Sequence, residues 1–79
     1  MISNMKVRRT QEIEIPDLSQ RLREARGDRA LAQVARDAGI NRTSLHRFES
    51  GMVDAIAYST LKKLEKVLDT DFGVSFDNH

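Results

Sequence analysis

The pattern of apolar and polar residues is most regular in the middle of the chain, where it predicts a short helix that ends at a glycine. Val34, Ala35 and Ala38 lie at spacings that place them on one face of a helix. Gly39 follows directly, where helices commonly end in a left-handed conformation that glycine adopts with little strain. Ile40 is also apolar, and we expect it to fill the angle between this helix and the next.

A second helix is predicted for residues 42–50. Asn41 precedes it, and asparagine is a frequent N-terminal cap. Leu45 and Phe48 recur at a spacing of three residues and are expected to face inward, and Gly51 marks the next helix end. Two short helices joined by a glycine turn form a helix-turn-helix, a motif whose second helix can enter the major groove of DNA.

The outward face of the 42–50 helix carries polar residues, and we predict that they contact DNA bases: Arg42, Thr43, Ser44, His46 and Arg47. Arginine can bond a guanine edge through two hydrogen bonds, and threonine or serine can bond bases or phosphates. Because no acidic residue occurs on this helix before Glu49, the surface is locally cationic. An ordinary solvated helix face has similar polarity, so polarity alone leaves both interpretations open.

Two more helices are predicted, one on each side of this pair. Residues 18–26 carry an apolar stripe, and Asp17 or Ser19 can cap their N-terminus. The members of that stripe are Leu18, Leu22 and Ala25. Residues 58–68 carry a longer stripe, which consists of Leu61, Leu64, Val67 and Leu68. The outside of this last helix is lined by Lys62, Lys63 and Lys66, for which a solvated face is the simpler interpretation and contact with phosphate or a partner the alternative.

Alternating patterns at the two ends of the chain predict short strands. Near the N-terminus, within residues 5–15, the apolar residues are separated by polar ones and all lie at odd-numbered positions: Met5, Val7, Ile13 and Ile15. This spacing indicates one strand or two short strands, ended by Pro16. Near the C-terminus the alternating apolar residues are Phe72, Val74 and Phe76.

An isolated strand leaves its backbone polar groups unpaired. We therefore expect residues 5–15 to pair with residues 72–76, either within one chain or across the two-fold axis of a homodimer. A disordered N-terminal arm is the alternative. The fold class expected is mainly α, with four to five short helices, a helix-turn-helix and a small sheet of terminal strands. We expect residues 1–16 to be a strand or arm, residues 17–69 the helix-turn-helix domain and residues 70–79 a C-terminal strand or tail.

The composition narrows the classes of protein that fit. A chain of 79 residues forms one domain at most, and its core is small because such a chain buries only about 60% of its unfolded surface. There is no cysteine, which excludes disulfides and thiolate metal sites. No apolar run approaches the roughly 20 residues that span a membrane, and the first ten residues do not resemble a signal peptide. We expect a cytoplasmic, nucleoid-associated protein with no membrane partner.

The net charge is only +1, but its distribution is uneven. Residues 20–51 contain seven arginines and four acidic residues, a net charge of +3, whereas residues 52–79 have a net charge of −2. The basic excess therefore coincides with the predicted helix-turn-helix, as electrostatic attraction to phosphate requires. The segment 52–57 is apolar and slightly acidic, which favours a partner surface there over contacts with the DNA backbone.

Residues suited to catalysis or metal binding are scarce. His46 and His79 are the two histidines, and neither has a carboxylate at ligand spacing. Ser44 and His46 are two residues apart on a helix and so do not face each other as a nucleophile and its base. There is also no glycine-rich phosphate loop. We expect no enzyme activity, no cofactor and no metal.

The segment VARDAGINRTSLHRFESG resembles the lambda-repressor/Cro-like (XRE-type) helix-turn-helix family. Val34–Ala35 match the opening pair of the family pattern, Gly39–Ile40 its turn, Leu45 its buried apolar position, and Glu49 with Gly51 its exit. The likeness extends over roughly residues 18–69. It implies that Arg26, at the end of the first helix, pairs with Glu49, and that these two residues and Gly39 hold the reading helix in place. The predicted phosphate contacts are Asn41, Arg29 and Ser50.

The resemblance and the residues together predict a sequence-specific DNA-binding transcriptional regulator, a repressor that binds double-stranded DNA as a dimer. The half-sites are expected about one helical turn apart, and the dimer is expected to form through the terminal strands, residues 52–57 or both. One alternative is the antitoxin of a toxin–antitoxin pair, with a terminal strand added to a partner protein. Another is a protein-interaction adaptor on the same fold that does not bind DNA.

Overall fold

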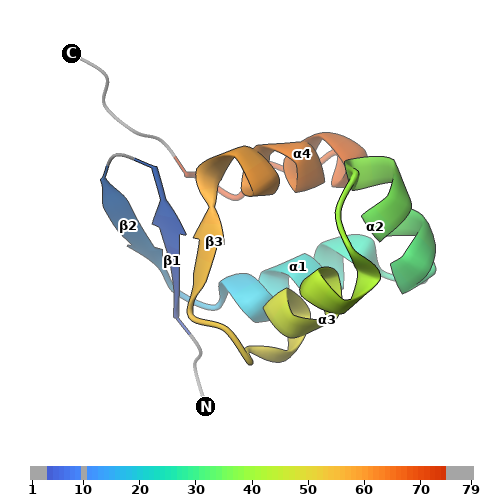
Figure 1. Cartoon of the computed structure of the whole chain (residues 1–79), viewed down its shortest axis with the longest axis horizontal. Coiled ribbons are helices and arrows are strands. Elements are labelled where there is room, and N and C mark those ends of the chain that lie inside the picture. Colours follow the sequence, from blue (N-terminus) through green and yellow to red (C-terminus); the bar gives the residue numbers. More distant parts are fainter. Residues whose placement is uncertain (1–3, 10, 75–79) are drawn as a thin grey trace.

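The predicted helices at residues 18–26, 42–50 and 58–68 all form with those bounds in the computed structural model, which describes residues 4–9 and 11–74. The order of elements is β1 (Met5–Arg8), β2 (Glu12–Ile15), α1 (Leu18–Arg26), α2 (Leu31–Ala38), α3 (Arg42–Ser50), β3 (Ala55–Ala57) and α4 (Tyr58–Leu68). The fold is mainly α with short strands, as the sequence predicts. The sheet lies at one end of the molecule and α2 at the other (Figure 1).

The N-terminal residues form two short strands joined in a hairpin. The sheet has the order β2-β1-β3; β1 pairs antiparallel with β2 and parallel with β3. Val7 stands opposite Ile13 on one side and Ile56 on the other, so the apolar positions of all three strands share the face that covers the core. The opposite face carries charged residues, among which Arg8 and Glu12 form an ion pair of 2.8 Å.

Within the chain, the expected pairing of residues 5–15 with the described residues 72–74 does not form, and pairing across a homodimer axis stays a prediction. The third strand of the sheet is β3, and residues 72–74 are not part of a strand; Phe76 lies outside the described residues. The alternation of the apolar residues Phe72 and Val74 has another cause: both side chains are buried in the core, at 3% and 7% exposure. Likewise, the segment 52–57 is less of an open surface than expected, because Ile56 is buried within the sheet.

Residues 70–74 are fixed by hydrogen bonds to side chains instead of by pairing with a strand. The Phe72 N–H donates to the Glu65 carboxylate at 2.8 Å, and the Phe72 carbonyl accepts from Arg21 at 3.1 Å. The guanidinium of Arg21 also lies 5.5 Å from the centre of the Phe72 ring. Because the segment's backbone groups are satisfied in this way, it can remain extended without joining the sheet.

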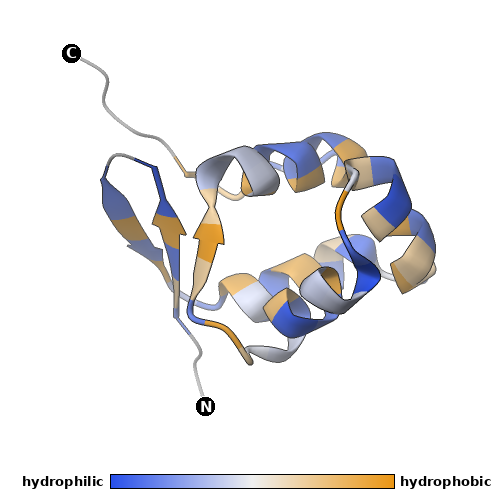
Figure 2. Cartoon of the chain, viewed as in Figure 1, coloured by the Kyte–Doolittle hydropathy of each residue, from blue (hydrophilic) through white to orange (hydrophobic). Residues whose placement is uncertain are grey.

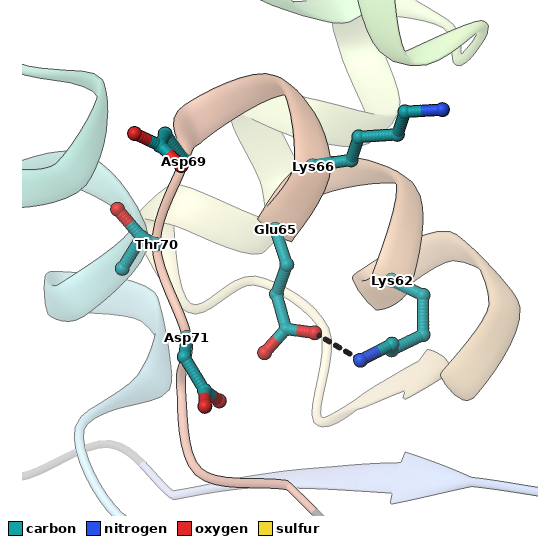
Figure 3. Close-up of a pocket in the computed structure, with 6 residues that line it drawn as sticks. All are labelled: Lys62, Glu65, Lys66, Asp69, Thr70 and Asp71. Atoms are coloured by element: carbon teal, nitrogen blue, oxygen red, sulfur yellow. Dashed lines mark ion pairs between the residues drawn. The ribbon is translucent and has the colours of Figure 1, made fainter.

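Glu65 is a buried carboxylate on the apolar side of α4. It faces a shallow hollow lined by Lys62, Glu65, Lys66, Asp69, Thr70 and Asp71, where Lys62 forms an ion pair of 3.0 Å with it (Figure 3). This pair raises the pKa of Lys62. Among the described residues no cluster of histidine and carboxylate side chains is suited to hold a metal ion. The bonds found at Glu65 anchor residues 70–74 to the helix.

The core lies between the sheet and the four helices. Figure 2 shows apolar residues interleaved with hydrophilic ones along the strands and helices that surround it. Leu18 and Leu22 of α1, Leu45 of α3, and Leu61 and Leu64 of α4 are fully buried. Met5 and Val7 of β1 belong to the same cluster, so the hairpin and the helices share one core. No helix in the described ranges is long and apolar enough to span a membrane.

Neither residue expected to cap α1 does so. Asp17 occupies the N-cap position in a left-handed conformation, with φ 58°, and its side chain makes no capping hydrogen bond. An N-cap side chain reaches the first-turn amides from an extended backbone, which Asp17 does not have. Ser19 lies inside the helix and is buried.

We expect the Asp69→Gly variant to be about 1 kcal/mol more stable than the natural chain. Asp69 ends α4 in a left-handed conformation, with φ 51°, which strains a residue that carries a Cβ. Its negative charge also lies at the unfavourable end of the helix dipole. The gain is measured by urea denaturation.

The matched control is Gly39→Ala, at the left-handed end of α2. A Cβ at Gly39 meets no atom within 4 Å, so the change introduces only the backbone strain and should lower stability by about 1 kcal/mol. If both variants changed stability in the same direction, the left-handed conformation would not be the cause.

Candidate nucleic-acid interface

The turn between α2 and α3 is built around Gly39. This residue has φ 70° and ψ 31°, and its N–H donates to the Arg36 carbonyl at 3.0 Å. The Ile40 N–H reaches back to the Ala35 carbonyl at 2.9 Å, which completes a Schellman ending of α2. Ile40 is half-buried and packs against the core. These bonds end α2 sharply and set the angle at which α3 leaves.

Both ends of α3 are closed by local hydrogen bonds. Asn41 has an extended backbone, and its Oδ1 accepts the Thr43 N–H at 2.7 Å. At the other end Gly51 is left-handed, with φ 73°, and the Met52 N–H donates to the Arg47 carbonyl. The Ser50 hydroxyl donates to the His46 carbonyl at 2.7 Å. A nine-residue helix with both ends fixed is a rigid platform for its side chains.

The side chains of α3 divide into an inner and an outer set. Leu45 is fully buried, and Phe48 is half-buried against the core. Of the five residues predicted to contact bases, Ser44 is half-buried and the other four are exposed. These four, which we call the outer face of α3, are Arg42, Thr43, His46 and Arg47. Helix α3 lies along one edge of the molecule and α4 along the opposite edge (Figure 1), so the outer face is not covered by the last helix.

An ion pair fixes α3 to α1 from behind. Arg26 donates from Nε and Nη2 to the two carboxylate oxygens of Glu49, at 2.8 and 2.9 Å. Glu49 is 5% exposed, and 22% of the Arg26 side chain reaches solvent. The hydrogen bond to Glu49 raises the pKa of Arg26, and partial burial opposes it, so the guanidinium stays charged. Because a bidentate pair constrains orientation as well as distance, it holds the α3 axis relative to α1.

Comparison with known families decides what this motif is. A helix-turn-helix family model matches residues 20–74, which is more than half of the chain. The chain belongs to the XRE-type, lambda-repressor-like helix-turn-helix family. It is therefore a DNA-binding regulator of the XRE type. A comparison with curated proteins found no match.

In this helix-turn-helix protein, Arg29 forms a hydrogen bond with a residue that is distant in the sequence. Its Nη1 donates to the Val67 carbonyl at 2.9 Å, near the end of α4. The Arg29 carbonyl in turn accepts from Arg26 Nη1 at 2.7 Å. The short α1–α2 connection thus links α4 to the ion pair behind α3. The predicted phosphate contact of Arg29 stays a prediction, since the residue is exposed and has further donors.

Among the described residues, most arginines that precede α2 bond another residue of the protein, whereas the two arginines of the outer face do not. Arg8, Arg21, Arg26 and Arg29 each bond another residue. Within the described part of the chain, the side chains of Arg42 and Arg47 make no hydrogen bond or ion pair with another residue. Their donors are therefore available to an external acceptor. Neither cation is neutralised by an acid on α3, because Glu49 is buried and paired.

Proposed function

We propose that this XRE-type protein is a transcriptional repressor that reads a symmetric operator as a homodimer. The observation that carries the proposal is the outer face of α3, where Arg42 and Arg47 are exposed on a rigidly anchored helix and have no partners among residues 4–9 and 11–74. Repression follows if the operator overlaps a promoter, because the bound dimer then excludes the polymerase. The protein works where the chromosome is, in the cytoplasm at the nucleoid.

In the bound state, α3 lies in the major groove with its outer face against the base edges. Arg42, Thr43 and Arg47 read bases directly, and Ser44 and His46 assist them. Phosphates on the two sides of the groove are held by Asn41 with the first amides of α3, by Arg29, and by Ser50, whose hydroxyl proton must turn from the His46 carbonyl to the phosphate. The Asn41 oxygen already caps α3, which leaves the side-chain N–H groups for the phosphate.

The dimer contact is best supported at Met52, directly after α3. Met52 is 69% exposed and is the large apolar residue of the described chain that is left in solvent. Two copies that meet there bring the C-terminal ends of their α3 helices toward a common axis, a geometry suited to half-sites about 34 Å apart. Self-pairing of β2 fits less well, because an antiparallel register centred on Ile13 sets Glu12 opposite the Glu14 of the second copy.

The DNA-binding role is tested by mobility shift of genomic fragments at low salt. We expect the natural chain to shift specific fragments, and Arg42→Ala combined with Arg47→Ala to abolish that shift. Arg23→Ala removes an exposed cation from α1 and serves as the charge control, so it should keep the preferred fragments. Retention of the same shift by the double variant would mean that α3 is not the reading helix.

For the dimer, we expect Met52→Lys to give a monomer in analytical ultracentrifugation and to weaken operator binding at least tenfold. A charge placed in an apolar contact is not compensated by a partner, which explains the loss. Circular dichroism should remain unchanged because Met52 lies outside the core. A Met52→Lys protein that stays dimeric would remove this surface from consideration.

An antitoxin role ranks second, and one observation favours it. In the described part of the chain β2 is an edge of the sheet, so one side of its backbone lacks a strand partner there and could receive a strand from another protein. The edge is only four residues long and carries Glu12 and Glu14, and it is followed by Pro16. These are also the features by which natural sheets protect an edge from pairing. A peptide-bound complex in which β2 amides gain protection from hydrogen exchange would support this role.

A further inference from the structure

The outer face of α3 is unusual in the side chains that it lacks. It presents two arginines, one threonine and one histidine, and no asparagine, glutamine, aspartate or glutamate. Asn41 and Glu49 flank this face, but the Asn41 oxygen caps the helix and Glu49 is buried against Arg26. The outer face therefore carries two arginines, which only donate hydrogen bonds, together with a threonine and a histidine, which can both donate and accept, and it has no carboxylate or side-chain amide.

The major groove presents acceptors and donors in a pattern that differs for each base. Adenine is read by the paired donor and acceptor of asparagine or glutamine, and cytosine donates to a carboxylate. Guanine presents two acceptors, N7 and O6, which match the two parallel donors of an arginine. A face with unpaired arginines and no carboxylate or amide side chain selects guanine and has no comparable means of selecting adenine or cytosine.

We propose that each operator half-site contains two guanines, one read by Arg42 and the other by Arg47. This inference rests on the proposed function, since it assumes that α3 enters the major groove. Thr43 lies beside Arg42, and its methyl group suits contact with a thymine methyl.

The spacing of the guanines follows from the helix. Arg42 and Arg47 are five residues apart, so at about 1.5 Å and about 100° per residue their Cα atoms are separated by about 7.5 Å along the axis and by about 140° around it. Base pairs are about 3.4 Å apart, so this separation corresponds to about two base-pair steps. Because the two side chains also leave the helix in different directions, the two guanines are expected a few base pairs apart, on either strand.

The test has two arms that use the same DNA. First, duplexes are selected from a random pool with the natural protein and with Arg42→Ala, Arg47→Ala and Arg23→Ala. With the natural protein we expect a symmetric motif that has two guanines in each half-site. Arg42→Ala and Arg47→Ala should each lose the requirement for one of these guanines. Arg23→Ala should still require both. Second, each guanine of the selected duplex is replaced in turn by 7-deazaguanine, which lacks the N7 acceptor. The natural protein should then bind about 5- to 150-fold more weakly at the two read positions.

The two arms distinguish a failure of the guanine assignment from a failure of the proposed function. A symmetric motif in which neither half-site requires guanine, or full affinity for every 7-deazaguanine duplex, would overturn the assignment of guanines and leave the regulator intact. Selection that yields no motif at all would overturn the proposed function itself. In Arg47→Ala, only the duplex modified at the Arg47 guanine should lose its sensitivity to 7-deazaguanine. Equal sensitivity in the variant and the natural protein would contradict the pairing of that residue with that base.

Discussion

The Glu49→Gln variant is expected to lose about 3 kcal/mol of its free energy of unfolding. The natural carboxylate is 5% exposed and accepts two hydrogen bonds from Arg26. An amide at this position keeps one acceptor oxygen, but it turns an NH2 group toward the guanidinium and removes the counterion of a partly buried cation, a change that typically lowers stability by about 3–5 kcal/mol. The lower end applies because part of Arg26 reaches solvent. Urea denaturation followed by circular dichroism measures the difference.

Glu24→Gln is the matched control, because Glu24 is exposed on α1 and bonds only the Gln20 side chain among the described residues. It should change stability by less than about 0.5 kcal/mol. A second variant, Arg26→Met with Glu49→Leu, removes both charges together and should recover much of the lost stability. If Glu49→Gln were as stable as Glu24→Gln, the ion pair would not anchor α3.

Phe72→Ala is expected to lower the free energy of unfolding by about 3–5 kcal/mol, the usual range for truncating a buried phenylalanine. The side chain is 3% exposed and belongs to the main core cluster. Its removal opens a cavity and also takes away the ring that Arg21 covers. The same denaturation experiment measures this loss, and faster amide exchange at residues 70–74 should accompany it.

The control for this variant is Asp71→Asn, on the same segment. Asp71 is exposed, and its Oδ1 accepts the Gly73 N–H, a bond that an asparagine oxygen can keep. We expect a change below about 0.5 kcal/mol. A loss under 1 kcal/mol for Phe72→Ala would show instead that residues 70–74 are a loosely attached tail.

The helices could be predicted from the sequence because local signals agree with the tertiary packing. In α3 the apolar spacing of Leu45 and Phe48, the cap at Asn41 and the glycine at its end all specify one helix. α1 and α4 have equally regular stripes. The outer face of α3 follows from the same periodicity, because residues that lie off an apolar stripe face solvent.

The third strand and the C-terminal segment could not be predicted, because their structure depends on distant residues. β3 consists of Ala55, Ile56 and Ala57, and alanine has little intrinsic preference for strands. Phe72 and Val74 alternate as a strand would, yet Glu65 and Arg21 take the Phe72 backbone groups. Glu65 itself gave a signal that could have been noticed, since it interrupts the apolar side of α4 between Leu64 and Leu68.

The candidate site also has features that follow from the local sequence and features that depend on distant residues. Periodicity places the residues of α3, but it does not reveal which polar groups are already occupied. Arg29 bonds the Val67 carbonyl 38 residues away, and the Ser50 hydroxyl bonds its own helix. Such bonds depend on where the chain returns in space, so only the structure separates Arg42 and Arg47 from the arginines that have partners.

The parallel pairing of β1 with β3 has a consequence for how this protein is made. β1 is made before β3, and Val7 gains its neighbour Ile56 only when synthesis has passed residue 57. Until then Met5 and Val7, both almost fully buried in the finished fold, lack the part of the core that β3 and α4 supply. A chain whose synthesis stops before residue 57 therefore leaves the apolar face of β1 without the cover that β3 and α4 provide in the complete sheet and core.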